Sequence, residues 1–494
     1  MDQTQIDVLR ATRVPAQGHL IDGTRVPASD GAVMEVLSPI DGQILTTLAR
    51  GTKQDMDAAI LSARRAFESG HWSRMAPASR KKVLHKWADL IQAEALSLAV
   101  LGVRDNGTEI GMALKAEPGS AAGTIRYYAE ALDKVYGEIA PTDPSVLGLI
   151  HKEPVGVVGA IIPWNFPLMI GAWKLGPALA AGNSVVVKPA ETASLSLLRM
   201  AELALEAGLP PGVLNVVTGD GAVVGQAMGL SMDVDVLAFT GSGPVGRCLL
   251  EYAARSNLKR VYLELGGKSP NVVFADAPDL DEAAKVSAAG IFRNSGQVCV
   301  AGSRLLVEES IHDAFVEAVA RHAQAFRVGD PLDLTNSIGA VNSLRQLEQD
   351  LDFVETAQSE GGAVVTGGQR VLEDTGGYYM APTVITNVGE TASLSQKEVF
   401  GPILAVTPFN GADQAIRLAN STVYGLAGAV WTSNLSLAHN MVARIRAGVV
   451  HVNTYGGADG TVPLGGIGQS GNGHDKSLHA FDKYLNLKTA WIKL

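Results

Sequence analysis

The sequence predicts an α/β protein in which doubly wound parallel sheets are covered by helices on both faces. One observation is the length of 494 residues, which exceeds what a single hydrophobic core usually serves and favours two or three domains. Another is a series of short, very apolar runs, each ended by Gly or Pro and followed by a segment with helical spacing. Such runs are typical of strands buried on both faces of a parallel sheet.

The elements follow this pattern along the chain. After an extended opening, we expect surface helices at Lys53 to Ser69 and Ser79 to Leu101, where apolar residues recur at helical spacing. The strands of a first sheet are expected in VGVVGAII, SVVVKP, VLNVVTG and DVLAFTG. From Asn271, the runs NVVFADA, SRLLVEES, GAVVTGG, ILAVTPF and AGAVWTS predict a second α/β domain. The closing LNLKTAWIKL alternates in polarity and predicts an edge strand available to a partner.

Composition excludes several classes of function. A net charge of −10 opposes binding to nucleic acid or anionic membrane. The start has no basic cluster before an apolar run, and the most apolar stretch, Val155 to Trp173, is interrupted by Pro163, Asn165 and Pro167, so neither a secretory signal nor a spanning helix is expected. With two cysteines and no H-x-x-x-H or H-E-x-x-H grouping, we expect a cytoplasmic protein without a disulfide framework or a catalytic metal.

A glycine motif follows the last strand of the first series. Gly241, Gly243 and Gly246 match G-x-G-x-x-G, and Glu264 lies 18 residues beyond Gly246. Taken alone, this pattern is a dinucleotide fingerprint with Glu264 as the acid that binds a ribose. In a chain with 54 glycines, the alternative is that these glycines only close a strand-to-helix turn.

Other motifs surround this one. They are Pro163 to Pro167 (PWNFP), Lys188 to Glu191 (KPAE), Leu263 to Pro270 (LELGGKSP) and Asn294 to Cys299 (NSGQVC). With these motifs in this order from about residue 20 onward, the chain resembles the aldehyde dehydrogenase superfamily. The resemblance implies a fold of two doubly wound parallel-sheet domains plus a small β oligomerisation element, assembled as a homodimer or homotetramer. The implied parts are an NAD-binding domain at 1–132 and 155–266, a catalytic domain at 267–454 and an oligomerisation segment at 133–154 and 470–494.

The chemistry of aldehyde oxidation suits particular residues. A thiolate on Cys299 can add to an aldehyde and form an adduct that expels hydride and leaves a thioester. By resemblance, the Asn165 side chain and the Cys299 N–H stabilise the oxyanion, Glu264 is the base, and Lys188 joins the catalytic set. Glu264 stands among leucines and glycines, which favours a raised pKa. The alternatives are a core cysteine at 299 and a solvated carboxylate at 264. We expect Cys248, in the helical run RCLLEYAA, to be a core residue.

The resemblance also implies a cofactor site. Lys188 and Glu191 match residues that bind the adenine ribose, and the carboxylate should repel a 2′-phosphate, so NAD is favoured over NADP. Gly221 and Ser242 match the pyrophosphate side, and Glu398 and Phe400 the nicotinamide ribose. The other implied cofactor positions are Ile162, Pro163, Trp164, Phe239, Thr240, Gly241, Val245, Glu264, Leu265, Gly266 and Cys299.

The substrate is predicted from the tail GNGHDKSLHAF and the loop NTYGGADGTVP. Both resemble those of bacterial gamma-glutamyl-gamma-aminobutyraldehyde and guanidinobutyraldehyde dehydrogenases, which implies an amino or acylamino aldehyde. Glu117 and Asp459 are candidates to attract a cationic end, although such charges are often only solvated. The expected pocket walls are Phe166, Trp173, Val298, Val300 and Leu464.

Three segments depart from the family pattern, and we expect them at the pocket mouth and subunit contacts: Asp105 to Glu109, Asn294–Ser295, and Pro463 to His474. The alternatives for function are a broad-specificity aliphatic or aromatic aldehyde dehydrogenase, a thiol esterase without a redox step, and a non-catalytic member of the fold.

Overall fold

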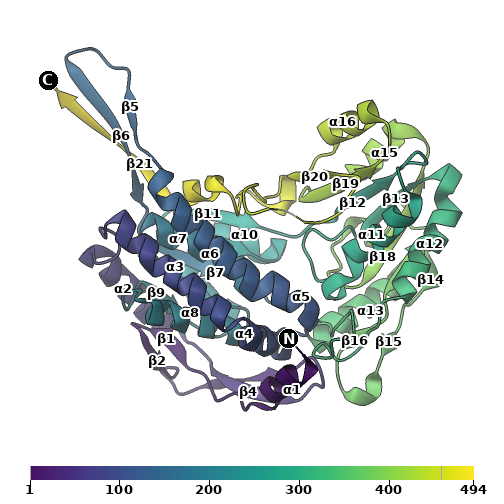
Figure 1. The fold of residues 1–494 in the computed structure, drawn as a ribbon, viewed down its shortest axis with the longest axis horizontal. Coiled ribbons are helices and arrows are strands. Elements are labelled where there is room, and N and C mark those ends of the chain that lie inside the picture. The colour runs from purple at the N-terminus through teal and green to yellow at the C-terminus, as the bar shows by residue number, and fades with distance from the viewer. Residues whose placement is uncertain (1, 458) are drawn as a thin grey trace.

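The computed structural model describes residues 2–457 and 459–494, so Ala458, in the loop used to predict the substrate, lies outside the described residues. Figure 1 shows two α/β halves side by side and an arm of strands that projects from the first half. No helix in the described ranges combines the length and apolar character that a bilayer crossing needs.

The N-terminal segment differs from the predicted extended opening. It begins with helix α1 (Gln3–Ala11), which is capped by the Asp2 side chain through the backbone N–H of Gln5. The following strands are β1 (His19–Ile21), β2 (Thr24–Val26), β3 (Val33–Leu37) and β4 (Ile44–Ala49). Helix α2 (Lys53–Ser69) is confirmed with the predicted bounds.

The second predicted helix is two helices. The chain leaves helical geometry at Glu94, between α3 (Pro77–Ala93) and α4 (Ala95–Asn106). Periodicity within the segment did not reveal this break. The break reflects different neighbours, since α3 packs on α6 whereas α4 packs on α1. The carboxylate of Glu94 binds Arg199, which anchors the bend to α8. The next helices are α5 (Ile110–Leu114), α6 (Ser120–Ala131), α7 (Pro167–Ala181), α8 (Leu195–Ala207), α9 (Gln226–Leu230) and α10 (Gly243–Ala254), with a π-helical turn η1 (Lys115–Gly119) before α6.

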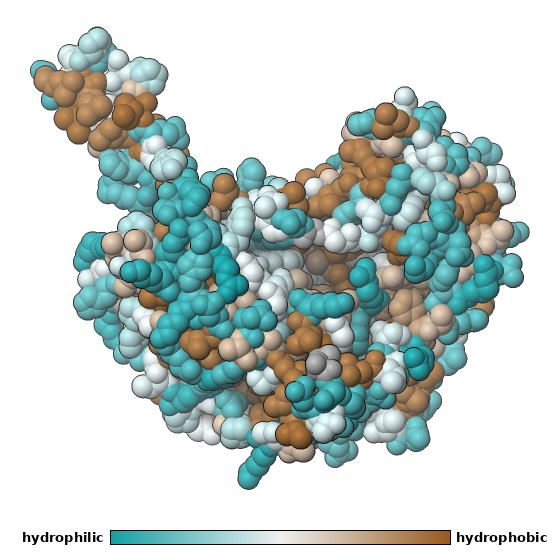
Figure 2. All heavy atoms as spheres, viewed as in Figure 1, coloured by the Kyte–Doolittle hydropathy of each residue, from teal (hydrophilic) through white to brown (hydrophobic). Residues whose placement is uncertain are grey.

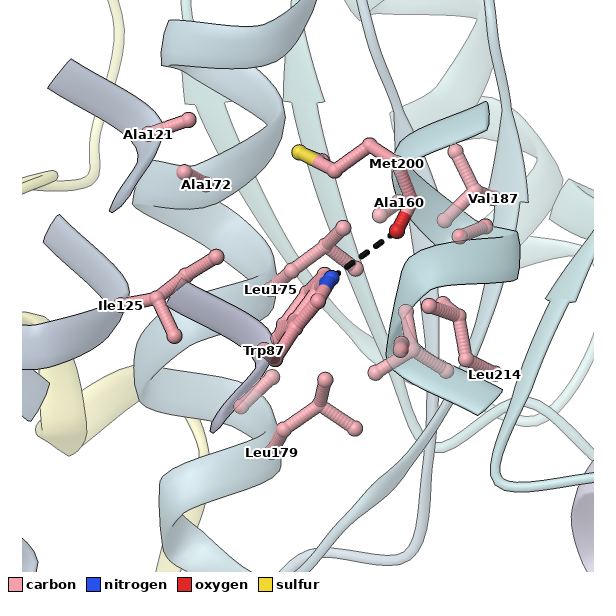
Figure 3. Close-up of a cluster of buried hydrophobic side chains, with 14 of the residues drawn as sticks. Trp87, Ala121, Ile125, Ala160, Ala172, Leu175, Leu179, Val187, Met200 and Leu214 are labelled. Carbon is pink, nitrogen blue, oxygen red and sulfur yellow. Dashed lines mark hydrogen bonds between the residues drawn. The ribbon is translucent and has the colours of Figure 1, made fainter. Parts of the chain in front are cut away.

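The first sheet has the strand order β11-β10-β7-β8-β9-β1-β2. The four predicted strands are confirmed, and a fifth parallel strand, β11, follows them. Buried helices cover the sheet, and Figure 3 shows Trp87 at the centre of this core, where its Nε1 donates to the Met200 carbonyl at 2.9 Å. The strand bounds are β7 (Val157–Ile161), β8 (Ser184–Lys188), β9 (Leu214–Val216), β10 (Val236–Thr240) and β11 (Arg260–Glu264).

The second sheet has the order β14-β17-β18-β13-β12-β19-β20 and is parallel except for β14. The five predicted strands of this half are confirmed. Its strands are β12 (Pro270–Val273), β13 (Arg304–Glu308), β14 (Ala363–Thr366), β17 (Thr383–Thr386), β18 (Ile403–Phe409), β19 (Ala427–Trp431) and β20 (Val449–Val452), and a separate hairpin joins β15 (Arg370–Val371) to β16 (Tyr379–Met380). Its helices are α11 (Leu280–Phe292), α12 (His312–Gln324), α13 (Leu344–Ser359), α14 (Ser393–Gln396), α15 (Gly411–Ala419) and α16 (Leu435–Arg444).

The arm is a small antiparallel sheet of β5 (Glu138–Ala140), β6 (Val146–Pro154) and β21 (Leu485–Lys493). The predicted C-terminal strand is therefore confirmed, and it pairs along its whole length with β6 of the same chain. Its outer edge is left for the predicted pairing with a partner, which stays a prediction.

The expectation that Cys248 is a core residue is wrong. Cys248 is exposed on α10. The buried positions of this helix are Gly246, Leu249 and Ala253, which form one face, and residue 248 falls outside that face.

Candidate active site

A cavity lies between the two halves, at the carboxyl ends of β10 and β11, where ligands bind in doubly wound sheets. It encloses about 820 Å³, counting space open to solvent. Figure 2 shows the surface hollowed between the halves. Its lining includes eleven of the predicted site residues together with four that the sequence did not indicate: Pro163, Trp164, Asn165, Thr240, Gly241, Ser242, Leu265, Gly266, Cys299, Glu398 and Phe400, then Ile170, Gln346, Gln349 and Val399.

Cys299 is partly exposed in this cavity, on a loop that follows a tight turn. Asn294 and Ser295 both hold left-handed backbone, with φ of 51° and 52°. The turn is held from below, because the Thr108 hydroxyl donates to Asn294 Oδ1 at 2.8 Å and Glu109 Oε1 accepts the Asn294 N–H at 3.1 Å.

These contacts correct one expectation. The departures at Asp105 to Glu109 and Asn294–Ser295 were expected at the pocket mouth, but the residues in contact are buried under the nucleophile loop. Two of the segments that depart from the family pattern, Asp105 to Glu109 and Asn294–Ser295, therefore contact each other.

Asn165 is buried beside Cys299, and its Nδ2 donates to the Gln297 carbonyl at 2.9 Å. An amide group has two N–H donors, and within residues 2–457 and 459–494 no acceptor is found for the second. The site can therefore offer that N–H to an oxygen in the cavity.

The thiol of Cys299 is strongly protonated at rest. Burial and, to a smaller extent, the negative charges of Glu398 and Glu264 together raise its pKa to about 12. A nucleophilic Cys299 must therefore lose its proton to a nearby base as it reacts.

Glu264 is buried at the end of β11 and does not line the cavity with Cys299. Its pKa lies well above the usual range because of burial and the nearby charge of Asp475, while Lys483 and Lys174 act in the opposite direction. The tail of the chain covers this carboxylate, with Leu265 N–H donating to the Ser470 carbonyl at 2.9 Å. A raised pKa is the property expected of a general base that works near neutral pH.

Three charged residues beside Glu264 were missed from the sequence. The Asp475 carboxylate accepts from Lys174 Nζ at 2.9 Å and from Lys483 Nζ through its other oxygen. The available signal was Lys174, the only cation in the apolar helix α7, because a buried charge needs a partner. The partner itself lies 301 residues away in the sequence.

The predicted ribose-binding residues lie together. Lys188 Nζ is 2.8 Å from Glu191 Oε1, which also accepts the Gly221 N–H at 2.7 Å. Glu191 is partly exposed, so its carboxylate can accept hydrogen bonds from hydroxyl groups. Among the described residues, Lys188 makes no hydrogen bond or ion pair with Cys299 or Glu264. Its predicted catalytic role therefore stays a prediction.

Glu398 and Phe400 were predicted for the nicotinamide side. The Glu398 carboxylate accepts the Gly267 N–H at 3.0 Å, and a Cβ on Gly266 would displace this carboxylate, since it would come 1.7 Å from it. The rings of Trp164 and Phe400 pack edge to face at 5.2 Å. The remaining predicted cofactor positions lie outside the cavity lining: Ile162 and Phe239 are buried, and Val245 is exposed on α10.

Trp173 and Asp459 line a second cavity, together with Met169, Tyr127 and Lys476. Helix α7 therefore carries residues of both cavities, Ile170 in the first and Trp173 in the second. Lys476, which the sequence analysis did not single out, places its Nζ 5.7 Å from the centroid of the Trp173 ring.

Glu117 is not part of this lining. It is buried in η1 and accepts the Met169 N–H at 2.8 Å, so it caps α7 rather than facing a substrate. Burial raises its pKa to about 8. The other expected pocket walls also lie outside both linings: Phe166 is buried, and Val298, Val300 and Leu464 are half-buried.

The described part of the chain contains no group of three or more His, Cys, Asp or Glu placed to hold a metal ion.

Comparison with known proteins supports this chemistry. The model of the aldehyde dehydrogenase family matches residues 26–490. The chain is 50% identical over 474 residues to the NADP/NAD-dependent aldehyde dehydrogenase PuuC of Escherichia coli strain K12, covering 96% of this chain and 95% of that protein.

Two solved structures match 100% of both chains with a TM-score of 0.98. One is gamma-glutamyl-gamma-aminobutyraldehyde dehydrogenase from Burkholderia cenocepacia J2315, at 48% identity. The other is the indole-3-acetaldehyde dehydrogenase AldA of P. syringae, solved with NAD+, at 47% identity. These findings confirm the predicted fold and the predicted class of reaction, oxidation of an aldehyde with a nicotinamide cofactor. The chain belongs to the aldehyde dehydrogenase family.

Proposed function

We propose that the chain oxidises an amino or acylamino aldehyde to its carboxylic acid with NAD, through a thiohemiacetal and a thioester on Cys299. The observation that carries the proposal is a single cavity that holds Cys299, Asn165 and Glu398, with Glu264 on the strand end beside it. A cysteine alone would also suit a thiol esterase, but an esterase needs neither Glu398 nor the Lys188–Glu191 pair.

In the first step, Cys299 sulfur bonds to the aldehyde carbon while its proton passes to Glu264. The carbonyl oxygen becomes an oxyanion and accepts from Asn165 Nδ2 and the Cys299 N–H. Fixed donors of this kind are each worth roughly 3–4 kcal/mol of transition-state stabilisation. The raised pKa of Glu264 suits it to hold this proton.

NAD, when bound, would supply the acceptor for the hydride that leaves the adduct carbon, and Cys299 would then hold the acyl group as a thioester. Glu264 first releases the thiol proton to solvent, and as a carboxylate it then takes a proton from water while the water oxygen bonds to the thioester carbon. The carbon–sulfur bond breaks, the acid product leaves and the thiol is restored. Glu264 thus serves as the base in both steps and alternates between its carboxylate and protonated forms.

The cofactor site favours NAD. Glu191 can accept the two ribose hydroxyls, and its charge repels a 2′-phosphate. Gly241 leaves room for close approach, since a Cβ there would come 2.4 Å from the Phe239 ring. The relative PuuC is named NADP/NAD-dependent, so both cofactors belong in the assay.

The substrate class rests on the second cavity and on the relatives. Asp459 is exposed at the cavity and its pKa is lowered, first by hydrogen bonds from Thr461, so it is ionised at neutral pH. An ionised carboxylate beside Trp173 and Tyr127 can attract an aldehyde with a cationic nitrogen, which would compete with Lys476 for Asp459 and for the Trp173 ring. A relative of matching structure is named for an acylamino aldehyde.

The first test is NADH formation with a panel of aldehydes, from acetaldehyde and benzaldehyde to 4-aminobutanal and its gamma-glutamylated form. We expect the highest kcat/KM for the amino and acylamino aldehydes, and complete loss in Cys299→Ala. Cys248→Ala is the matched control, because Cys248 is exposed on α10 and should not be needed. Activity in Cys299→Ala would contradict the mechanism, and preference for neutral aldehydes would contradict the substrate class alone.

Asp459→Asn separates charge from shape in the second cavity. We expect KM for 4-aminobutanal to rise roughly twofold to fivefold, because an exposed carboxylate attracts a cation only weakly. KM for a neutral aldehyde should stay unchanged. Equal effects on both aldehydes would remove Asp459 from the substrate site.

We also propose that the chain works in the cytoplasm as a homodimer or homotetramer assembled through residues 133–154 and 470–494. The proposed NAD-binding part is 1–132 with 155–266, and the proposed catalytic part is 267–454. The exposed apolar side chains of the arm support the assembly, because they include Tyr136, Ile139, Leu487 and Trp491.

A further inference from the structure

Four charged side chains are buried together behind the nucleophile loop. Glu264 ends β11, Lys174 lies on α7, Asp475 lies in the tail, and Lys483 closes the last short helix, Leu478–Lys483. Each is at most 8% exposed. The group holds two carboxylates and two ammonium groups, so its charges balance.

Asp475 is the centre of the group. One carboxylate oxygen accepts from Lys174 Nζ at 2.9 Å, and the other accepts from Lys483 Nζ. Its backbone is fixed by two hydrogen bonds with Leu464, at 2.7 and 2.8 Å. One lysine would suffice to neutralise one aspartate, so the second ammonium compensates a further negative charge.

That further charge is Glu264. The tail brings Asp475 close to it, because Asn472 N–H donates to the Leu263 carbonyl at 3.0 Å and Gly473 packs against the carboxylate. Glu264 Oε1 has no hydrogen-bond partner within the described ranges, so burial and nearby charge, not hydrogen bonding at that oxygen, set how readily it ionises. The mechanism assigns no role to Lys483.

We propose that Lys483 is a positioning residue for the general base: together with Lys174 it lets the group hold an ionised Asp475 and an ionised Glu264 with its charges balanced. The proposal rests on the assignment of Glu264 as the base. Without Lys483, Glu264 and Asp475 would share one ammonium, and one negative charge would be uncompensated in a buried site.

The other titratable neighbours do not replace Lys483. Tyr484 lies beside the same group, and burial together with the charges of Asp475 and Glu264 holds it neutral by raising its pKa well above the usual value. The thiol of Cys299 is also neutral at rest. Lys174 and Lys483 are the two cations that lower the pKa of Glu264, and Asp475 raises it.

The test is the pH profile of steady-state NADH formation in Lys483→Met, Lys483→Arg and the wild type. Loss of the ammonium should move the acid limb of kcat up by about one pH unit, which is roughly a tenfold loss at a pH below both midpoints. At high pH the rates should converge. Lys483→Arg keeps the charge and should restore the wild-type profile. Lys285→Met, which removes an exposed lysine paired with Glu282, is the control.

A double variant tests the charge balance itself. Lys483→Met with Asp475→Asn again leaves one ammonium for one carboxylate, so its acid limb should return to the wild-type position or below it. A purely structural role for Lys483 predicts instead that the second change adds a further loss at every pH. A uniform fall in rate, or an unchanged acid limb in Lys483→Met, would overturn the proposal.

The same assays separate this proposal from the proposed mechanism. If Glu264→Gln keeps the wild-type acid limb, Glu264 is not the base and the mechanism fails, whatever Lys483 does. If Glu264→Gln loses steady-state turnover while Lys483→Met has the wild-type profile, the mechanism stands and the role of Lys483 is refuted. Circular dichroism melting of each variant identifies any that fails to fold.

Discussion

At the residue scale, the thiol of Cys299 illustrates how the apo site restrains its nucleophile. Burial and two carboxylates hold the thiol protonated, so it is a poor nucleophile toward solutes that do not bring their own activation. The carboxylates differ in role, because Glu398 contacts the Gly267 backbone while Glu264 belongs to the buried charged group. Such restraint protects an active-site cysteine from alkylation and oxidation between turnovers.

Glu398→Gln should therefore speed the alkylation of Cys299. The pKa of Glu398 is raised to about 7 by burial, so above pH 7 it carries the charge that raises the thiol pKa. Removing that charge should increase the iodoacetamide rate at alkaline pH by roughly twofold to tenfold. The measurement needs a Cys248→Ser background, because Cys248 is exposed. An equal or slower rate would mean that Glu398 does not act on the thiol.

At the element scale, the turn before Cys299 depends on a helix end from the other half of the molecule. Residues 107–109 follow α4, and they hold Asn294 through the Thr108 hydroxyl and the Glu109 carboxylate. Asn106 also donates to the carbonyl of Trp164 at 3.2 Å, so the same segment supports the strand end that carries Asn165. The left-handed residues 294 and 295 need such support, because this backbone is strained for residues other than glycine.

Thr108→Val should weaken both stability and catalysis. It leaves the buried Asn294 Oδ1 without its donor, which costs about 1–3 kcal/mol. We expect a lower melting temperature and a fall in kcat, because the turn before Cys299 loses a hydrogen bond that fixes its position. Thr12→Val, which removes an exposed hydroxyl bond to Val8, is the matched control. If both variants behave alike, the Thr108 contact has no part in positioning the nucleophile.

At the scale of the whole molecule, the arm is the least protected element. A three-stranded sheet is stable only when an apolar face is covered, yet Leu487 and Trp491 are 72% and 68% exposed on β21. Figure 2 shows apolar residues gathered at the end of the arm, away from both halves. A second copy of the chain is the occupant that our assembly proposal assigns to this surface.

Trp491→Glu should therefore weaken assembly. A charge in the centre of an apolar contact loses the buried area and adds an unpaired charge, so the oligomer should dissociate at concentrations where the wild type is intact. Light scattering after size exclusion measures the mass directly. Leu435→Glu, at an exposed leucine on α16, is the matched control. If the mass of Trp491→Glu equals that of the wild type, the arm is not the interface.

Some features of this protein followed from the sequence by itself. The apolar runs determine buried strands because their side chains suit both faces of a sheet, and the residues of the nucleophile, the oxyanion donor and the ribose pair lie in short local motifs. Strands β7, β8, β10, β12 and β13 were predicted for this reason. Local pattern was not enough for the break at Glu94 or the exposed face of α10.

Only the tertiary structure decided the long-range pairs. Lys174 pairs with Asp475, Thr108 bonds to Asn294, and β21 pairs with β6, and in each case the partners are more than a hundred residues apart in the sequence. Periodicity describes which side of an element is buried but not which distant element covers it. The charge state of a buried carboxylate such as Glu264 depends on those distant neighbours, because in a site with little water each nearby charge strongly shifts its pKa.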